Sequence, residues 1–223
     1  MTRLIMGKHA IEEVVKRDPE RIIEIYSHQK EHPFKVTVVP KQNLSKMVSS
    51  ESHQGLVAKV KEREFLTPKE FLKGSPEKSV VLMVDSIQDP QNFGAILRAA
   101  ECFGTSGVIY STNRNVGLTP VVSKASVGAS EIVPLLPVSN LADTLKKFQE
   151  GGYFSVAAEV KKGAHMLTSF EFPEKTLLIM GAEGSGIQPI LSKNSDFHVM
   201  IPMQGSIDSL NVSQATAVFL SFI

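Results

Sequence analysis

The chain has 223 residues, 42% of them hydrophobic and 21% charged, which is the composition of an ordinary soluble globular protein. No window of about 18 consecutive apolar residues is present, so the sequence predicts no membrane span. The net charge is only +1, and the bulk composition therefore gives no indication of nucleic-acid binding.

Charge is divided unevenly along the chain. Residues 1–62 carry 11 lysines and arginines against 8 acidic residues, a net +3, whereas residues 63–223 carry 13 against 15, a net −2. A mildly basic N-terminal part suits a phosphate-rich partner, although ordinary surface charge explains so small an excess equally well. The N-terminus has no long apolar stretch typical of a signal peptide, and we expect a cytoplasmic protein.

The first 62 residues are expected to form a small α/β domain. A helix is predicted over residues 3–16, because its apolar side chains share one face. Strands are predicted over residues 22–26, 35–39 and 56–60, the last of them after a His53-Gln54-Gly55 turn. Residues 63–78 are charged and contain two prolines and a glycine, so we interpret them as a linker.

From residue 79 onward the pattern changes to that of an α/β domain. Strands are predicted over residues 80–84, 108–110, 132–136, 154–158, 177–180 and 197–201. Helices are predicted over residues 93–103, 120–127, 141–149, 189–191 and at the C-terminus. This alternation, with a continuous apolar first strand, predicts a mostly parallel sheet over residues 79–223.

Cys102 is the only cysteine, which excludes an internal disulfide and any cysteine-cluster metal site. We expect no bound metal. Its place on the apolar face of a predicted helix indicates a buried, unreactive thiol.

The first segment that carries chemistry follows the strand at residues 80–84. It contains Asp85, Asp89, Asn92, Gly94 and Arg98, and ligands of open α/β sheets bind at the carboxyl ends of the strands. Asn92 could simply cap the following helix, and the two aspartates could shape the turn. Arg98 lies among apolar neighbours, so its guanidinium needs an anionic partner, either a ligand or a structural salt bridge.

The second segment is the loop after the strand at residues 177–180. Gly181, Gly184 and Gly186 allow the backbone to approach a ligand closely or to adopt positive φ. The spacing is not Gly-x-Gly-x-x-Gly, and no P-loop lysine follows, so neither a dinucleotide site nor a P-loop is supported. Glu183 in this loop is either a turn residue or a functional acid.

The third segment runs from residue 201 to the end of the chain. Pro202 and Gly205 interrupt regular structure before Ser209 and Asn211 introduce an apolar helix. One polar side chain suffices to cap a helix. The surplus indicates a ligand held at the helix entrance by backbone groups and short polar side chains, with an ordinary capped helix as the alternative.

In this order, the three segments resemble the SpoU (TrmH) family of RNA ribose 2′-O-methyltransferases of the SPOUT superfamily. They are similar to the family motifs Asn-x-Gly-x-x-x-Arg, Gly-x-Glu-x-x-Gly and Ile-Pro-Met-x-Gly followed by Ser-Leu-Asn-Val-Ser. The stretch Lys-Ala-Ser-Val-Gly-Ala-Ser-Glu at residues 124–131 also resembles the family. Together these matches cover about residues 79–223.

Residues 4–60 resemble the substrate-binding domain of the 23S rRNA guanosine-2′-O-methyltransferase branch, an L30e-like unit. Too few residues separate Tyr26 from Lys35 for the helix that this unit normally carries, so we expect a shortened form. The implied division is an RNA-binding domain at residues 1–62, a linker at residues 63–78 and a catalytic domain at residues 79–223.

The resemblance implies a SPOUT-type trefoil-knotted parallel sheet flanked by helices, with S-adenosyl-L-methionine bound in the knot. The backbone of the second and third motif loops would hold it. The implied cofactor-binding positions are Gly181, Ile201 and Leu210, with Met180, Gly186 and Met203 as neighbours. A homodimer is also implied, and we expect the apolar final helix to be covered by the other copy.

The implied reaction is in-line transfer of a sulfonium methyl group to a ribose 2′-hydroxyl of RNA. The resemblance assigns the central role in this reaction to Arg98. Because a guanidinium stays protonated, we assign it to phosphate binding and to stabilisation of the developing alkoxide. Asn92, Glu183, Ser209 and Asn211 are expected to position Arg98 and the ribose.

The expected substrate is a guanosine in 23S rRNA, with tRNA as the alternative. A loop or single strand is the expected target, because the ribose must be reachable. Two other classes stay open, namely a non-catalytic RNA-binding or ribosome-assembly protein and a nicotinamide oxidoreductase. The oxidoreductase would lack the glycine fingerprint after its first strand.

Overall fold

The computed structural model describes all 223 residues, which form two compact units by their internal contacts. The first unit comprises Met1–Glu64, Asp89–Arg98 and Gly117–Ile132. The second unit comprises Phe65–Gln88, Ala99–Val116 and Val133–Ile223. The first unit therefore includes two segments from the part of the chain that carries the sequence motifs.

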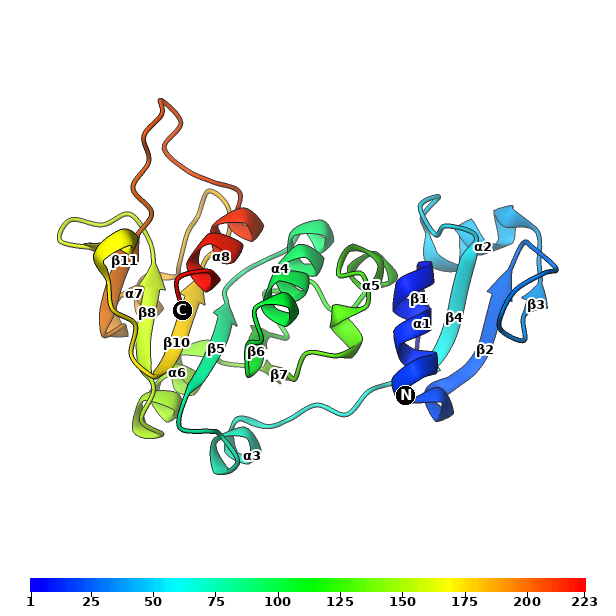
Figure 1. Cartoon of the computed structure of the whole chain (residues 1–223), viewed down its shortest axis with the longest axis horizontal. Helices are drawn as coiled ribbons and strands as arrows, with labels where there is room; N and C mark the ends of the chain where they lie inside the picture. Colours follow the sequence, from blue (N-terminus) through cyan, green and yellow to red (C-terminus); the bar gives the residue numbers. More distant parts are fainter. The chain divides into compact units, whose positions relative to one another are not determined.

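A four-stranded sheet forms the centre of the first unit, with the strand order β1-β4-β2-β3 (Figure 1). Its strands are β1 (Thr2–Met6), β2 (Ile22–Ser27), β3 (Thr37–Val38) and β4 (Leu56–Lys61). The helices beside it are α1 (Lys8–Arg17), the 3-10 turn η1 (Pro19–Arg21) and α2 (Lys41–Val48). β4 pairs antiparallel with both β1 and β2, whereas β3 pairs parallel with β2.

The two helices α1 and α2 cover opposite faces of this sheet. Neighbouring residues of a strand point to opposite faces. Accordingly, Ile5 packs with Ile11 and Val14 of α1, whereas the next residue, Met6, packs with Leu44 of α2. All five side chains are buried. The sheet is therefore the middle layer of three.

The helix predicted over residues 3–16 is wrong in its first part. Residues 2–6 form β1, which pairs with β4 along its whole length, and the helix begins only at Lys8. Gly7 separates the two elements with a φ of 94°, a conformation that favours glycine. The apolar run Leu4-Ile5-Met6 serves both faces of the sheet, so the alternation expected of a strand is hidden.

Three further expectations for this region can be compared with the structure. The strand predicted over residues 35–39 shortens to Thr37–Val38, and the sequence pattern does not reveal α2. As expected, no helix lies between Tyr26 and Lys35. Within residues 63–78, α3 (Pro68–Lys73) forms behind a reciprocal capping box of Thr67 and Glu70.

Two later segments complete the first unit. They contain the start of α4 (Pro90–Cys102), all of α5 (Pro120–Ala125) and the 3-10 turn η2 (Ala129–Glu131). α4 meets α5 at Gly94, where an added Cβ would lie 2.4 Å from the Cβ of Ala125, so only glycine allows this approach. α5 in turn contacts β1, where Met6 N donates a hydrogen bond of 3.1 Å to Ser123 Oγ.

A buried ion cluster holds η2 against the N-terminal sheet. The Glu131 carboxylate accepts hydrogen bonds from Arg3 Nη2 at 2.6 Å and from Arg21 Nη2 at 3.0 Å. The Glu131 side chain is only 1% exposed. Burial alone would raise the pKa of Glu131, but the charges and hydrogen bonds of Arg3 and Arg21 outweigh it and hold that pKa below its ordinary value. A charged carboxylate therefore joins three segments of the first unit.

A seven-stranded sheet forms the centre of the second unit, with the order β7-β6-β5-β10-β8-β11-β9 (Figure 1). Its strands are β5 (Ser79–Val84), β6 (Gly107–Ser111), β7 (Leu135–Val138), β8 (Phe154–Ala158), β9 (His165–Met166), β10 (Lys175–Met180) and β11 (Phe197–Met200). Its other elements are α3, α6 (Leu141–Glu150), the 3-10 turn η3 (Leu167–Ser169), α7 (Pro189–Asn194) and α8 (Val212–Leu220). Every strand pair is parallel, as the apolar runs predict.

The parallel arrangement brings the carboxyl ends of the strands to one edge of the sheet, where ligands of such sheets bind. β5 and β10 are neighbours, with Val84 paired to Met180, so Asp85 and Gly181 follow at the same edge. β8 lies on the other side of β10 and pairs with β11. The residues after β8 and β11 therefore join this edge.

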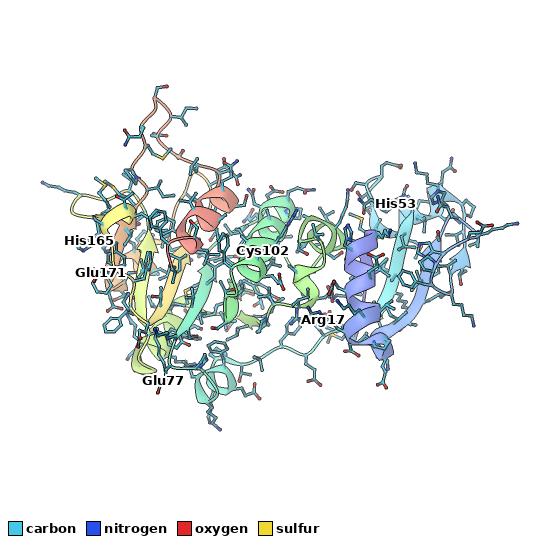
Figure 2. All side chains as sticks on the ribbon, in the orientation of Figure 1. Arg17, His53, Glu77, Cys102, His165 and Glu171 are labelled. Carbon is cyan, nitrogen blue, oxygen red and sulfur yellow. The ribbon has the colours of Figure 1, made fainter.

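Two expectations for the second unit, the start of one strand and the burial of Cys102, are wrong. The strand predicted over residues 132–136 begins only at Leu135, because η2 and the turn after it occupy the preceding residues. Cys102 is exposed, not buried (Figure 2). It ends α4, and the buried face of that helix stops at Ala100, so the last residues extend into solvent.

None of the helices combines the length and the apolarity that crossing a membrane would require.

Candidate active site

The loop of the second motif folds tightly on itself after β10. Ala182 and Gly186 exchange two backbone hydrogen bonds, at 3.2 and 2.9 Å, and Gly184 and Gly186 have positive φ. A Cβ on Gly181 would lie 2.2 Å from the carbonyl carbon of Gly186. The space that a side chain at position 181 would need is therefore filled by the backbone of the same loop. Contact of Gly181 and Gly186 with a cofactor stays a prediction.

Asp85 fastens the end of β5 to the residue that precedes α7. Its fully buried carboxylate accepts hydrogen bonds from Gln188 N at 2.8 Å, Gln188 Nε2 at 2.6 Å and Ser86 Oγ at 2.9 Å. A buried carboxylate requires such donors, since it is otherwise costly to remove from water. Asp85 therefore shapes the loops of the site, in agreement with its interpretation as a turn residue.

Asp89, and not Asn92, caps α4. Asp89 Oδ1 accepts a hydrogen bond of 3.0 Å from Gln91 N, and its Oδ2 accepts one of 3.3 Å from Asn92 N. These bonds satisfy the backbone donors at the start of the helix. Asn92 lies within the first turn of α4, so the explanation of Asn92 as a helix cap is wrong.

Arg98 lies one turn after Gly94 on the same face of α4. Its side chain is exposed and forms no ion pair or hydrogen bond with the rest of the chain. The apolar neighbours of Arg98 in the sequence therefore do not bury it, and the alternative of a structural salt bridge is not realised within the chain. The guanidinium is left for an anion from outside, although its role in catalysis stays a prediction.

Asn211 joins the third motif to the second. Its Oδ1 accepts a hydrogen bond of 2.9 Å from Ser213 N and caps α8, while its Nδ2 donates to Glu183 Oε2 at 3.2 Å. Asn211 is therefore the helix cap that the alternative interpretation required. Its hydrogen bond to Glu183 is not needed for capping and connects the two motif loops. Ser209 is exposed, and its hydroxyl donates to the neighbouring Asp208 at 3.3 Å.

A cavity of about 140 Å³ lies among the ends of β8, β10 and β11 and one face of α8. Of the predicted cofactor-binding residues, Met180, Ile201, Met203 and Leu210 line it, together with Ser209 from the predicted catalytic set. Gly181 and Gly186 do not. Pockets for small molecules usually measure about 300–1,000 Å³, so this cavity encloses only part of a nucleoside-sized ligand.

The lining of this cavity suits an apolar ligand that carries a positive charge. Most of its side chains are apolar, and its only charged side chains are the carboxylates of Glu159 and Asp208. Two negative groups attract a cation at short range. The residues present therefore fit S-adenosylmethionine, whose sulfonium and ammonium groups are both cationic.

Sequence reasoning missed Glu159. Its Oε1 accepts a hydrogen bond of 2.6 Å from Ser192 Oγ, and it lies 2.8 Å from His198 Nδ1 and 3.6 Å from Lys161 Nζ. These neighbours all contact Oε1, which leaves Oε2 for a ligand. The position of Glu159 directly after β8, at the carboxyl edge of a parallel sheet, is the signal that could have found it.

Two family profiles match the chain. The profile of the SpoU rRNA Methylase family covers residues 79–221, and the profile for RNA 2′-O ribose methyltransferase substrate binding covers residues 4–66. The chain belongs to the SpoU rRNA Methylase family. The resemblance seen in the three motifs and in the N-terminal region is thereby confirmed.

Several known proteins are similar to this chain over nearly its whole length. RlmB of Shewanella oneidensis, a 23S rRNA (guanosine-2′-O-)-methyltransferase, is 36% identical and covers 97% of this chain and 94% of its own. A Staphylococcus aureus protein, named only at the level of TrmH family tRNA/rRNA methyltransferases, is 34% identical over 97% and 93%. The AdoMet-bound rRNA methyltransferase of Sinorhizobium meliloti shares the fold, with a TM-score of 0.82 over 99% of this chain and 86% of that chain at 21% identity.

Membership of the SpoU family and the similar relatives confirm the expected fold class and the expected class of enzyme, an RNA ribose 2′-O-methyltransferase. They give no support to the nicotinamide oxidoreductase. The threading of the chain into a knot and the roles of single residues stay predictions.

Proposed function

We propose that this protein transfers a methyl group from S-adenosylmethionine to the ribose 2′-hydroxyl of a guanosine in 23S rRNA. The observation that carries the proposal is the hydrogen bond between Asn211 and Glu183, which joins the second and third motif loops beside the cavity. The similarity to the Shewanella RlmB, over nearly the whole of both chains, supports guanosine in 23S rRNA as the substrate.

The cavity would hold the methyl donor between the ends of β10 and β11. Met180, Ile201 and Leu210 would contact its apolar parts, while Glu159 and Asp208 would attract its cationic groups. Gly181 and Gly186 would keep the loop closed around it. When bound, S-adenosylmethionine supplies an electrophilic sulfonium methyl group.

Arg98 would act on the RNA. An exposed guanidinium without a partner in the chain suits bidentate binding of a phosphate next to the target ribose. From that position it would stabilise the negative charge that develops on the 2′-oxygen as the proton leaves. Asn92, Glu183, Ser209 and Asn211 would orient Arg98 and the ribose for in-line transfer.

The test is a methyl-transfer assay with a 23S rRNA transcript, followed by mapping of the methylated ribose. Arg98→Ala should lower turnover by about a hundredfold or more, the usual effect of removing one group that stabilises an oxyanion. Cofactor affinity measured by calorimetry should stay unchanged. The matched control is Arg17→Ala, which removes an exposed arginine of α1. Near-normal turnover of Arg98→Ala would disprove the assigned role.

A tRNA substrate is the second candidate, because the similar Staphylococcus aureus protein is named for tRNA and rRNA alike. Competition between equimolar 23S rRNA and total tRNA in one assay decides between them, and methylation confined to tRNA would refute the rRNA proposal. Absence of turnover with both, despite tight RNA binding, would instead favour a non-catalytic RNA-binding or ribosome-assembly protein.

The proposal includes the division of labour expected from the sequence. Residues 1–62 would bind RNA, residues 63–78 would link, and residues 79–223 would thread into the trefoil knot and catalyse the transfer in the cytoplasm. It also includes a homodimer, supported by Phe222 and Ile223, which are 49% and 40% exposed at the end of the chain. Sedimentation should then give twice the chain mass of 24.4 kDa, and a monomer would disprove this part.

A further inference from the structure

The Gln54 turn of the first unit brings three separate segments together. Gln54 Oε1 accepts a hydrogen bond of 3.3 Å from Lys8 N at the start of α1. At Gly7, an added Cβ would lie 3.3 Å from Gln54 Oε1 and 3.2 Å from Cγ of Lys124 in α5. On the other side of the turn, the ring of His28 lies directly over Gly55. The turn is therefore a meeting point of α1, α5 and the end of β2.

His53 anchors this turn from within the first unit (Figure 2). Its side chain is fully buried, and Nδ1 accepts a hydrogen bond of 3.0 Å from Gly55 N. Nε2 therefore carries the proton and donates to Ser45 Oγ of α2 at 3.1 Å. Burial lowers the pKa of His53, which agrees with a neutral ring. The turn is thus held rigidly while Gln54 faces outward.

Positive charge gathers around this turn. Lys8, Lys41 and Lys124 come from α1, α2 and α5. Lys8 and Lys124 lie beside Gln54 at Gly7, and Lys41 lies one turn before Ser45, the α2 residue that bonds His53. The nearby acids are Glu12, which lies 3.8 Å from Lys8 Nζ, and Glu51, whose charge acts on His53. Neither Lys41 nor Lys124 has a carboxylate within ion-pair distance. Cations from three helices thus lie around the turn, and two of them, Lys41 and Lys124, have no internal ion-pair partner.

The N-terminal ends of α1 and α2 add to the positive electrostatic potential around the turn. Neither Gly7 nor Pro40 caps its helix with a side chain, and neither first turn contains an acidic residue. In contrast, α3, α5, α6 and α8 all have side-chain caps. Gln54 Oε1 already accepts a hydrogen bond from Lys8 N at the start of α1, but the positive end of each helix dipole still favours an anion from outside. They act here together with the lysines.

We infer that the Gln54 cluster, defined as Lys8, Lys41, Gln54 and Lys124, binds consecutive phosphates of the substrate RNA. Three cations on separate helices match a polyanion better than a single small anion, because each lysine can meet a different phosphate. The inference rests on the proposed function for the identity of the RNA. It goes beyond it by placing the grip at the junction of the N-terminal domain with α5, and not on the N-terminal domain alone.

This junction also connects the cluster to the first motif. Lys124 precedes Ala125, which packs on Gly94 of α4, and Arg98 follows Gly94 by one helical turn. The cluster and Arg98 belong to the same compact unit. RNA phosphates fixed by Lys124 are therefore held by a helix in direct contact with the one that carries Arg98. The cluster is a positioning site for the RNA and takes no part in the chemistry.

The test compares two double variants of the full-length protein that remove equal charge. Lys41→Gln with Lys124→Gln alters the cluster, whereas Lys46→Gln with Lys16→Gln alters exposed lysines elsewhere on α2 and α1. Affinity for a 23S rRNA transcript is measured by fluorescence anisotropy over a range of salt concentrations. Thermal melting checks that each variant is folded, and Lys41→Gln alone is measured if the double variant is not.

The cluster variant should bind RNA about tenfold more weakly, and its slope of log affinity against log salt should fall by about 1.4, at about 0.7 for each phosphate contact on a single strand. The control should retain wild-type affinity and slope. Equal losses in both variants, or none in the cluster variant, would overturn the inference. Absence of methylation by the wild type would defeat the proposed function while leaving this binding comparison intact. Cofactor affinity should be the same in all variants.

Discussion

The cavity of the second unit and the Gln54 cluster of the first are built in opposite ways. The cavity is lined mainly by apolar side chains at strand ends, and the loop that follows β10 turns on glycine. The cluster consists of long cationic side chains on three helices around one polar turn. One site depends on the shape of the backbone, and the other depends on charge.

This difference teaches how each site can recognise its ligand. A small, defined molecule is selected by the walls of a pocket, so the backbone that forms the walls must be held closely. A polymer is recognised through a repeated phosphate, and flexible cations can serve that purpose without a fixed wall. We therefore expect changes in the cavity to act through geometry, and changes in the first unit to act through electrostatics.

The largest effect is expected from Gly181→Ala, which tests whether the cavity depends on the geometry of the loop after β10. The added methyl would lie 2.2 Å from backbone of the same loop, where no side chain can move aside. Overpacking of this kind costs about 3 kcal/mol when the loop keeps its native shape. Because the proposed cofactor site requires that shape, cofactor affinity should fall by more than a hundredfold in calorimetry. The control is Gly117→Ala, where nothing lies within 4 Å of the new methyl. Unchanged affinity would mean that the loop does not form the binding wall.

Glu131→Gln tests the electrostatic side at the ion cluster that closes the first unit. Neutralising Glu131 leaves the charge of Arg21 uncompensated and removes one of the two carboxylates that pair with Arg3, so it should destabilise the protein by about 3 kcal/mol. Urea unfolding at pH 7 measures the difference. The control is Glu150→Gln, at an exposed position of α6. A loss of unfolding free energy no larger than that of Glu150→Gln would show that the Glu131 ion cluster is not needed for stability.

The difference in unfolding free energy between the wild type and Glu131→Gln should depend on pH with a definite sign. Because the pKa of Glu131 is held below its ordinary value of 4.5, its contribution is present at neutral pH and is lost as pH falls through the folded-state pKa. The stability gap between wild type and Glu131→Gln should therefore narrow from pH 7 towards acid. A gap that widens in acid would contradict the charged state of Glu131.

Glu159→Gln is expected to have a smaller effect and sharpens the comparison, since it removes one of two charges in an otherwise apolar cavity. A hydrogen bond to a charged group contributes about 1.5 kcal/mol, so cofactor affinity should fall by about tenfold. Calorimetry with Glu77→Gln as an exposed control measures this. Affinity equal to that of the control would show that Glu159 serves only Ser192 and His198.

The smallest effect is the response of cofactor binding to salt. A single ligand in a partly enclosed cavity releases few counterions, so raising salt from 50 to 200 mM should change cofactor affinity by less than about twofold, whereas RNA affinity should fall by tenfold or more. Equal salt dependence of the two ligands would remove the distinction between the sites.

The sequence predicted the second unit better than the first. Strands such as β5 and β10 are continuous apolar runs between polar loops, and their short length favours a strand over a buried helix. In contrast, Leu4-Ile5-Met6 fits a helix and a two-faced strand equally well, and only pairing with β4 decides. Long-range pairing of this kind is not visible in a local pattern.

The candidate site shows the same limit. Motif residues such as Asn211 and Leu210 could be named from the sequence, since their order and spacing are specific. The exposure of Arg98 and Cys102 could not, because it depends on which face of α4 is buried and on where along the helix that burial stops. Glu159 was missed because it belongs to no motif and gains its position only from the neighbours of β8.

The ion pair between Arg3 and Glu131 joins residues that are 128 positions apart. During synthesis at the ribosome, Arg3 and Arg21 must therefore wait for Glu131 until more than half of the chain has emerged, and until then Arg3 has only Glu62 as an ion-pair partner. Contacts over such long separations slow the acquisition of native structure. The interval leaves the early chain dependent on its own two helices, and premature termination before residue 131 would yield a fragment with no means of completing its first unit.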